Sequence, residues 1–160
     1  MTAVRWRAAF VAASVAWAVL LVAVPFAASQ RHVSPMAAAL IAGVYAVGSL
    51  VCHQLPERSY HLWAAQMPVC ARCAGIYFGA VLGGVAGAIR TAKAVRHSRE
   101  NPVWRPRLAI AVAVAPTMVT LAYEWSTGDA PSHAIRAAAG VPIGVVVAWL
   151  IVAATDNQVN

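Results

Sequence analysis

The sequence predicts an all-α integral membrane protein, a single polytopic bundle of about five transmembrane helices. Of its 160 residues, 61% are hydrophobic and only 11% are charged, and the mean hydropathy is +0.68. Soluble domains carry about 25% charged and about 45–50% apolar residues, so an ordinary soluble enzyme is excluded. The apolar content also excludes intrinsic disorder. No linker or low-complexity segment divides the chain, which predicts one domain over residues 1–160.

Five apolar segments approach the length of about 20 residues that a membrane-spanning helix requires. The first is uncharged from Ala8 to Ser29. It is longer than the apolar region of a signal peptide, about 7–15 residues, so we expect a retained helix. The expected helices cover residues 8–29, 34–51, 69–89, 108–125 and 136–154.

Basic residues predict the orientation of the bundle. The net charge is +7, and six of the 12 Lys and Arg residues lie in the segment 90–107 between the third and fourth expected helices. The positive-inside rule places this segment in the cytoplasm. Five spans then put the N-terminus on the opposite side, although Arg5 and Arg7 favour the cytoplasm. A nucleic-acid or anionic-lipid patch is the alternative interpretation, but a topology signal accounts for the charge more simply, and the bilayer is the expected partner.

Glycines at intervals of four predict close helix packing. Gly75, Gly79, Gly83 and Gly87 fall on one face of the third helix, and Gly140 and Gly144 repeat the pattern in the fifth. Such stripes let a second backbone approach closely. The partner is either another helix of the chain or a second copy in a homo-oligomer.

A cysteine–histidine cluster lies between the second and third helices. Cys52 and His53 end the second helix, and Cys70 and Cys73 form a Cys-x-x-Cys pair after Pro68, which suits the first turn of a helix. Three cysteines and a histidine are a tetrahedral zinc donor set, so Cys52, His53, Cys70 and Cys73 are the predicted ligands. Adjacent residues on a helix point about 100° apart, so both Cys52 and His53 reach one ion only where the helix unwinds. Otherwise His61 or a water takes the fourth place.

Two other interpretations of the cysteines stay open. A membrane thiol–disulfide oxidoreductase would use Cys70 and Cys73, with Cys52 as a nearby third thiol. Alternatively, the cysteines are buried apolar residues, or a structural metal site within a transporter or scaffold.

The loop between the fourth and fifth helices lies on the same face as the cysteines. Glu124 and Arg136 border this loop near the membrane, where ionisable groups are usually paired or functional. A mutual ion pair is the simpler interpretation. The alternative is a polar pocket for a small or lipidic substrate, lined by Glu124, Arg58, Arg72 and Arg136. There Glu124 would act as general base or fourth ligand and Arg136 would bind an anion. No nucleophile triad or phosphate loop is visible, so whether the chain is an enzyme stays open.

Two motifs resemble those of a known family. Cys-His-Gln-x-x-Pro-Glu-Arg-Ser from Cys52, followed by Pro-Val-Cys-Ala-Arg-Cys-x-Gly-Ile-Tyr-x-Gly up to Gly79, resembles a domain-of-unknown-function family of small prokaryotic integral membrane proteins. A second match is similar to the acidic residue and Arg-x-x-x-Gly-x-x-x-Gly helix of that family, at Glu124 and at Arg136, Gly140 and Gly144. Family members carry Asp-Gly where this chain has Glu124-Trp125. The resemblance implies a location in the prokaryotic cytoplasmic membrane and no particular activity.

Overall fold

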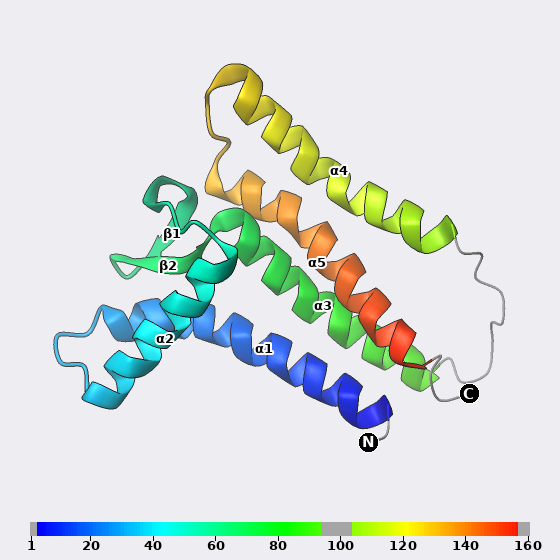
Figure 1. Ribbon diagram of the computed structural model, residues 1–160, viewed down its shortest axis with the longest axis horizontal. Coiled ribbons are helices and arrows are strands. Elements are labelled where there is room, and N and C mark those ends of the chain that lie inside the picture. The colour runs from blue at the N-terminus through cyan, green and yellow to red at the C-terminus, as the bar shows by residue number, and fades with distance from the viewer. Residues whose placement is uncertain (1–2, 94–103, 157–160) are drawn as a thin grey trace.

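The computed structural model describes residues 3–93 and 104–156, and it is predominantly helical, as expected. Its helices are α1 (Ala3–Ala28), α2 (Pro35–Val51), α3 (Ala71–Lys93), α4 (Trp104–Thr127) and α5 (His133–Asp156) (Figure 1). Each lies where the hydropathy pattern places it, and α1, α4 and α5 begin about one turn before the expected residue. Most of the basic segment 90–107, namely 94–103, lies outside the described residues.

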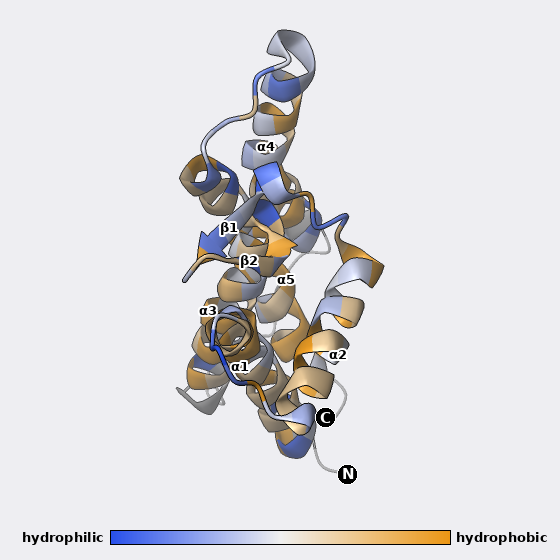
Figure 2. Cartoon of the chain, turned by 90° about the vertical axis from the view of Figure 1, so that its left-hand side faces the viewer, coloured by the Kyte–Doolittle hydropathy of each residue, from blue (hydrophilic) through white to orange (hydrophobic). Residues whose placement is uncertain are grey.

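Four of these helices, α1, α3, α4 and α5, are long and apolar enough to cross a membrane. The 17 residues of α2 extend over only about 25 Å, less than the bilayer core of about 30 Å. Figure 1 shows α2 lying across the C-terminal part of α1, and Figure 2 shows it from the side where α1 and α3 are seen nearly end-on. The second apolar segment, residues 34–51, is therefore a helix, as predicted, but it differs from the other four in length and direction.

The direction of α1 corrects the predicted position of the N-terminus. Trp17 stacks edge-on against Tyr77, with ring centroids 5.9 Å apart, while Phe10 and Val11 face Gly84. Residue numbers fall along α1 as they rise along α3, so the two helices are antiparallel. The N-terminus therefore lies at the same end of the bundle as the end of α3 (Figure 1). This arrangement differs from the predicted opposite ends, because that prediction counted α2 as a span.

The glycine stripes of α3 and α5 pack against each other within the chain. A Cβ atom on Gly75, Gly79 or Gly83 would overlap the carbonyl oxygens of Ala137, Val141 and Val145, respectively. A Cβ on Gly144 would in turn overlap the carbonyl oxygen of Ile76. Residue numbers rise together on both helices, so α3 and α5 are parallel and begin at the same end. Since each stripe is covered by the other, neither is free to form the homo-oligomer face that the sequence left open.

A short β-hairpin between α2 and α3 is absent from the predicted elements. After a 3₁₀ turn, η1 (Pro56–Arg58), β1 (Ser59–Leu62) pairs antiparallel with β2 (Ala65–Cys70). The two-residue turn has positive φ at Trp63 (52°) and Ala64 (64°). Such turns normally contain Asn-Gly or Asp-Gly, so the local sequence carries no hairpin signal. The hairpin caps the end of the bundle where α3 and α5 begin (Figure 1).

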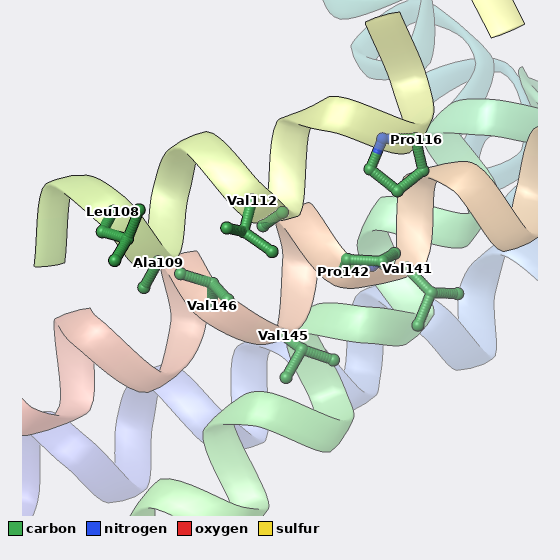
Figure 3. A pocket seen from close by; sticks show the side chains of 9 residues that line it. Leu108, Ala109, Val112, Pro116, Val141, Pro142, Val145 and Val146 are labelled. Carbon is green, nitrogen blue, oxygen red and sulfur yellow. The ribbon is translucent and has the colours of Figure 1, made fainter. Parts of the chain in front are cut away.

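An apolar groove of about 860 Å³ runs between α4 and α5. Figure 3 shows its walls, which are formed by Leu108, Ala109, Val112, Ala113, Pro116, Val141, Pro142, Val145 and Val146. Pro116 and Pro142 both lie inside their helices. The groove lies between two of the helices that are long and apolar enough to cross a membrane.

Candidate functional site

The three cysteines converge from three different elements. Cys52 caps the C-terminus of α2, Cys70 is the last residue of β2, and Cys73 lies in the first turn of α3. Their sulfur atoms all lie within 4.8 Å of one another. With Zn–S bonds of about 2.3 Å, the sulfurs of a tetrahedral zinc site lie about 3.8 Å apart. The cluster therefore approaches the size of a three-thiolate metal site.

Backbone and thiol donors around the cluster favour a thiolate at Cys70. The N–H of Cys70 donates to the Cys52 sulfur at 3.1 Å. A hydrogen bond from the Cys73 thiol, together with the N–H groups of the first turn of α3 and the Cys52 thiol, lowers the pKa of Cys70 to about 5, against the opposing effect of burial. Cys70 occupies the position before the first helical residue, where unpaired N–H groups and the helix dipole stabilise a negative charge. A deprotonated sulfur is the form that binds metal.

The cysteines are held in place by glutamine side chains from the same segment. Gln54 has φ of +51° and donates through Nε2 to the carbonyl oxygens of Tyr45 (2.8 Å) and Pro68 (2.7 Å). Gln66 donates back to the Gln54 carbonyl oxygen at 2.5 Å, and its own carbonyl oxygen accepts from the Tyr45 hydroxyl. These bonds fasten the end of α2 to β2, and so fix Cys52 relative to Cys70.

An apolar shell surrounds the sulfur cluster. Cys52 is buried together with Leu21 of α1, Met67 and Val69 of β2 and Ala74 of α3. Cys70 and Cys73 are half-buried, and all three cysteines are free thiols. The site is thus shielded from water on the side of the core and accessible on the other side.

The predicted fourth ligand, His53, is placed apart from the sulfurs. Its side chain is exposed and is not among the ligand atoms grouped within 4.8 Å. The helix ends at Cys52, whose φ of −144° and ψ of 136° are extended. In an extended chain, adjacent side chains point to opposite sides. The helix does unwind at Cys52, but this turns the side chain of His53 away from the sulfur atoms and toward the surface. His61 is exposed as well.

The Cys-x-x-Cys pair was expected within the first turn of a helix, but only Cys73 lies there, and Cys70 belongs to the preceding strand. Pro68 lies in β2, and α3 begins only at Ala71, so the pair straddles a strand-to-helix junction. Both strands of a two-stranded hairpin are edge strands, where proline is tolerated. The junction orients Cys70 from a strand and Cys73 from a helix toward the same point.

A second group of polar residues, the arginine cluster, contains Glu124, Arg58, Arg72 and Arg136. The carboxylate of Glu124 contacts Arg136 through Oε1 and Arg72 through Oε2 at 3.2 Å, and Arg58 lies 3.9 Å from Oε1. The Glu124 and Arg136 side chains are 7% and 3% exposed, whereas Arg58 is 47% exposed. The expected ion pair between Glu124 and Arg136 is present, and two further arginines join it.

Helix packing explains why these residues meet. Because α3 and α5 are parallel, Arg72 and Arg136 lie in the first turns of both helices at one end of the bundle, and α4 delivers Glu124 there in its last turns. Thr120 accepts a hydrogen bond from Arg72 at 3.2 Å. Thr117 donates to the Ala139 carbonyl oxygen at 2.8 Å and ties α4 to α5.

The sulfur cluster and the arginine cluster share one segment of chain. Arg72 lies between Cys70 and Cys73, and Arg58 adjoins Ser59, which pairs with Cys70 across the hairpin. His133 at the start of α5 lies 3.2 Å from the Glu57 carbonyl oxygen, which holds η1 against the helix. Both carboxylate oxygens of Glu124 are engaged by arginines, and neither belongs to the sulfur group, so this geometry favours a charge partner over a metal ligand.

The sequence reasoning missed Gln54, Gln66 and Thr120. Uncharged polar side chains are sparse in this apolar chain, and Gln54 follows the Cys-His pair directly. A polar residue within an apolar segment usually has a hydrogen-bonding partner, and that signal would have found Gln66 and Thr120, whereas Gln54 lies in a polar stretch and carries no such signal.

Comparisons with known proteins place the chain in a family of predicted membrane proteins. A family model described as "Predicted membrane protein (DUF2085)" matches residues 52–150. An uncharacterized protein, MJ1492, of Methanocaldococcus jannaschii is 55% identical over 40 residues, which cover 25% of this chain and 26% of the relative. An uncharacterized protein of Methanothermobacter thermautotrophicus is 50% identical over 30 residues, 19% of this chain and 27% of the relative.

The matched segments thus span about a quarter of the length of these archaeal relatives. No solved structure matches the chain. The family match covers more than half of the chain, from the first cysteine through most of α5, and includes every residue of both clusters. The chain belongs to this family of predicted membrane proteins.

Proposed function

We propose that the protein holds a zinc ion between Cys52, Cys70 and Cys73, at one end of its membrane bundle. The supporting observation is the convergence of three sulfur atoms within 4.8 Å, from the end of α2, the end of β2 and the start of α3. The N–H donor to Cys52 and the low pKa of Cys70 favour the anionic form that zinc requires.

We assign the fourth coordination position to a water or a small ligand. Structural zinc sites are closed by four protein ligands, whereas catalytic sites have three and keep one position open. Three thiolates with an open position match the second type. Bound there, zinc would polarise a ligand or lower the pKa of a water. The adjoining arginine cluster would supply the polar wall of a pocket for a small or lipidic substrate.

Metal analysis of the detergent-purified protein tests this proposal. Inductively coupled plasma mass spectrometry should find about one equivalent of zinc per chain. Most of this zinc should be lost in Cys70→Ser and in Cys52→Ser. Less than half an equivalent of any transition metal, unchanged in Cys70→Ser, would refute the metal site.

His53→Ala is the matched control, because His53 adjoins a proposed ligand but is exposed. We expect it to retain its zinc. Loss of zinc in His53→Ala together with the cysteine variants would instead establish the Cys₃His set that the sequence predicts.

Thiol–disulfide exchange is the second candidate, favoured by the lowered pKa of Cys70 beside Cys73. The Cys70 thiolate would attack a disulfide of a substrate protein and release one substrate thiolate. Cys73, after loss of its proton, would then attack Cys70, release the second substrate thiolate and leave a Cys70–Cys73 disulfide. Three alkylatable thiols that no oxidant pairs would exclude this chemistry.

The bundle end that carries the N-terminus is proposed to face the cytoplasm. Counted along the sequence with four spans, Arg5, Arg7 and the six basic residues of the segment 90–107 fall on the side of the N-terminus, whereas Arg31, Arg58, Arg72 and Arg136 fall on the other side. The ratio of eight to four follows the positive-inside rule more clearly than a five-span count does. Both clusters would then lie at the outer face of the membrane.

A further inference from the structure

We propose that the arginine cluster is a binding site for a phosphate group. This inference goes beyond the zinc site and does not depend on it. The site would be formed by the guanidinium groups of Arg58, Arg72 and Arg136 around Glu124, and its ligand would be a phosphate monoester or free phosphate. Its supporting observations are an excess of positive charge, buried donors without partners and an open side.

The charges of the cluster do not balance. One carboxylate faces three guanidinium groups, which leaves an excess of two positive charges, close to the charge of a phosphate dianion. Glu57, on the neighbouring η1, is exposed; it forms no ion pair with these arginines among the described residues, but its charge attracts Arg136 at longer range. The Cys70 thiolate of the metal-free protein, or zinc with three thiolates, would carry one net negative charge and would offset only half of the excess. Grouping like charges at low dielectric is unfavourable unless a counter-ion joins them.

Donors within the cluster also lack partners. The Nε atoms of Arg72 and Arg136 are buried and have no hydrogen-bond partner in the described part of the chain. Arg136 is 2% exposed, so its Nε cannot rely on bulk water. A buried charged donor without a partner is costly. Arginine presents planar pairs of donors that match the oxygens of phosphate, so phosphate would satisfy both charge and hydrogen bonding.

The cluster has an accessible side and an apolar side. Arg58, with 47% of its side chain exposed, marks the route from solvent. The groove between α4 and α5, which are the helices that carry Glu124 and Arg136, lies deeper in the membrane-spanning part. The phosphate could therefore belong to a soluble ion or to a lipid headgroup whose acyl chain occupies the groove.

Phosphate-dependent thermal stability of the detergent-purified protein tests the site. We expect inorganic phosphate to raise the unfolding midpoint relative to chloride at equal ionic strength. Binding should weaken about tenfold or more in Arg58→Gln and Arg72→Gln, since each loses a charged donor. Arg31→Gln is the matched control, because it removes the same charge from an exposed residue at the same end of the bundle, and it should bind as the wild type does.

Glu124→Gln provides a result that a purely structural ion cluster would not give. Removal of the carboxylate raises the excess positive charge, so phosphate should bind more tightly and restore more of the lost stability than in the wild type. No phosphate-dependent shift in the wild type, or equal shifts in Arg31→Gln, Arg58→Gln and Arg72→Gln, would overturn the proposal.

A second experiment, with a lipid, distinguishes free phosphate from a lipid headgroup. Phosphatidic acid in mixed micelles should bind more tightly than inorganic phosphate if the acyl chain uses the groove. Val112→Trp, which fills the groove, should then weaken lipid binding and leave phosphate binding unchanged. Equal affinity for both, unaffected by Val112→Trp, would assign the site to free phosphate. Lipid binding that is the same in Arg58→Gln and Arg72→Gln would count against the headgroup site.

Discussion

The backbone N–H of Cys70 donates a hydrogen bond to the sulfur of Cys52 at 3.1 Å, across 18 residues of sequence. This bond joins the end of α2 to the end of β2 directly at the proposed metal site. Replacement of Cys52 by valine keeps the apolar volume but removes the acceptor. We expect the metal-free protein to lose about 1–3 kcal/mol of unfolding free energy, because the N–H of Cys70 is left without a partner. Thermal unfolding against His53→Ala, at an exposed neighbour, measures the difference, and equal midpoints would contradict the role of this bond.

The pKa of Cys70 predicts an unusual reactivity profile. With a pKa of about 5, the thiol of the metal-free protein is already a thiolate at pH 6, whereas an ordinary cysteine is not deprotonated until above about pH 8. Alkylation of Cys70 by iodoacetamide should therefore reach its half-maximal rate near pH 5 and change little from pH 6 to pH 8. Mass spectrometry of the modified peptide measures it. A rate that still rises about tenfold per pH unit at pH 7 would show that the donors around Cys70 do not stabilise its thiolate.

Glycine stripes predict a position-dependent effect of one added methyl group. In Gly144→Ala the new Cβ would overlap the Ile76 carbonyl oxygen, and we expect a loss of about 1–3 kcal/mol. Gly43→Ala is the matched control, because nothing lies within 4 Å of its added Cβ. Alanine is favoured over glycine in helices, so this variant should be as stable as the wild type or more so. Similar unfolding midpoints for both variants in detergent would contradict the close packing of α3 and α5.

The antiparallel packing of α1 and α3 predicts that both chain termini lie on one side of the membrane. Four spans return the chain to its starting side, whereas five would not. Reporter proteins that are active only in the cytoplasm, fused separately to the N-terminus and to the C-terminus, should therefore both be active. Activity of only one fusion would show that α2 crosses the bilayer.

Hydropathy was sufficient to locate the helices, because uninterrupted apolar segments are the strongest signal in a membrane sequence. Hydropathy did not predict that α2 runs in a different direction from the other helices. The segment Pro35–Val51 has the composition of a membrane span, and only its shorter length sets it apart. The hairpin was missed because Trp63 and Ala64 adopt positive φ values that their types rarely show. Local sequence therefore failed where tertiary packing fixes the backbone.

For the candidate sites, the cysteines could be grouped from spacing, and the structure brings Cys52, Cys70 and Cys73 together. The place of His53 depended on one backbone conformation, the extended Cys52, which residue types do not encode. The sequence predicted that the residues of the arginine cluster lie on one face of the bundle. It did not predict that all three arginines approach the carboxylate of Glu124. Those contacts depend on how closely α3 and α5 approach and on which residues of the two glycine stripes meet.

The equal spacing of the two glycine stripes does not by itself fix the sliding position of α3 along α5. Gly75, Gly79 and Gly83 meet the carbonyl groups of residues that are themselves four apart. A slip of four residues, about 6 Å, would again set most glycines against carbonyls. The same slip would separate Arg72 from Arg136 and leave Glu124 able to reach only one of them. The carboxylate of Glu124 therefore helps to fix the register of α3 against α5, because it contacts an arginine at the start of each helix.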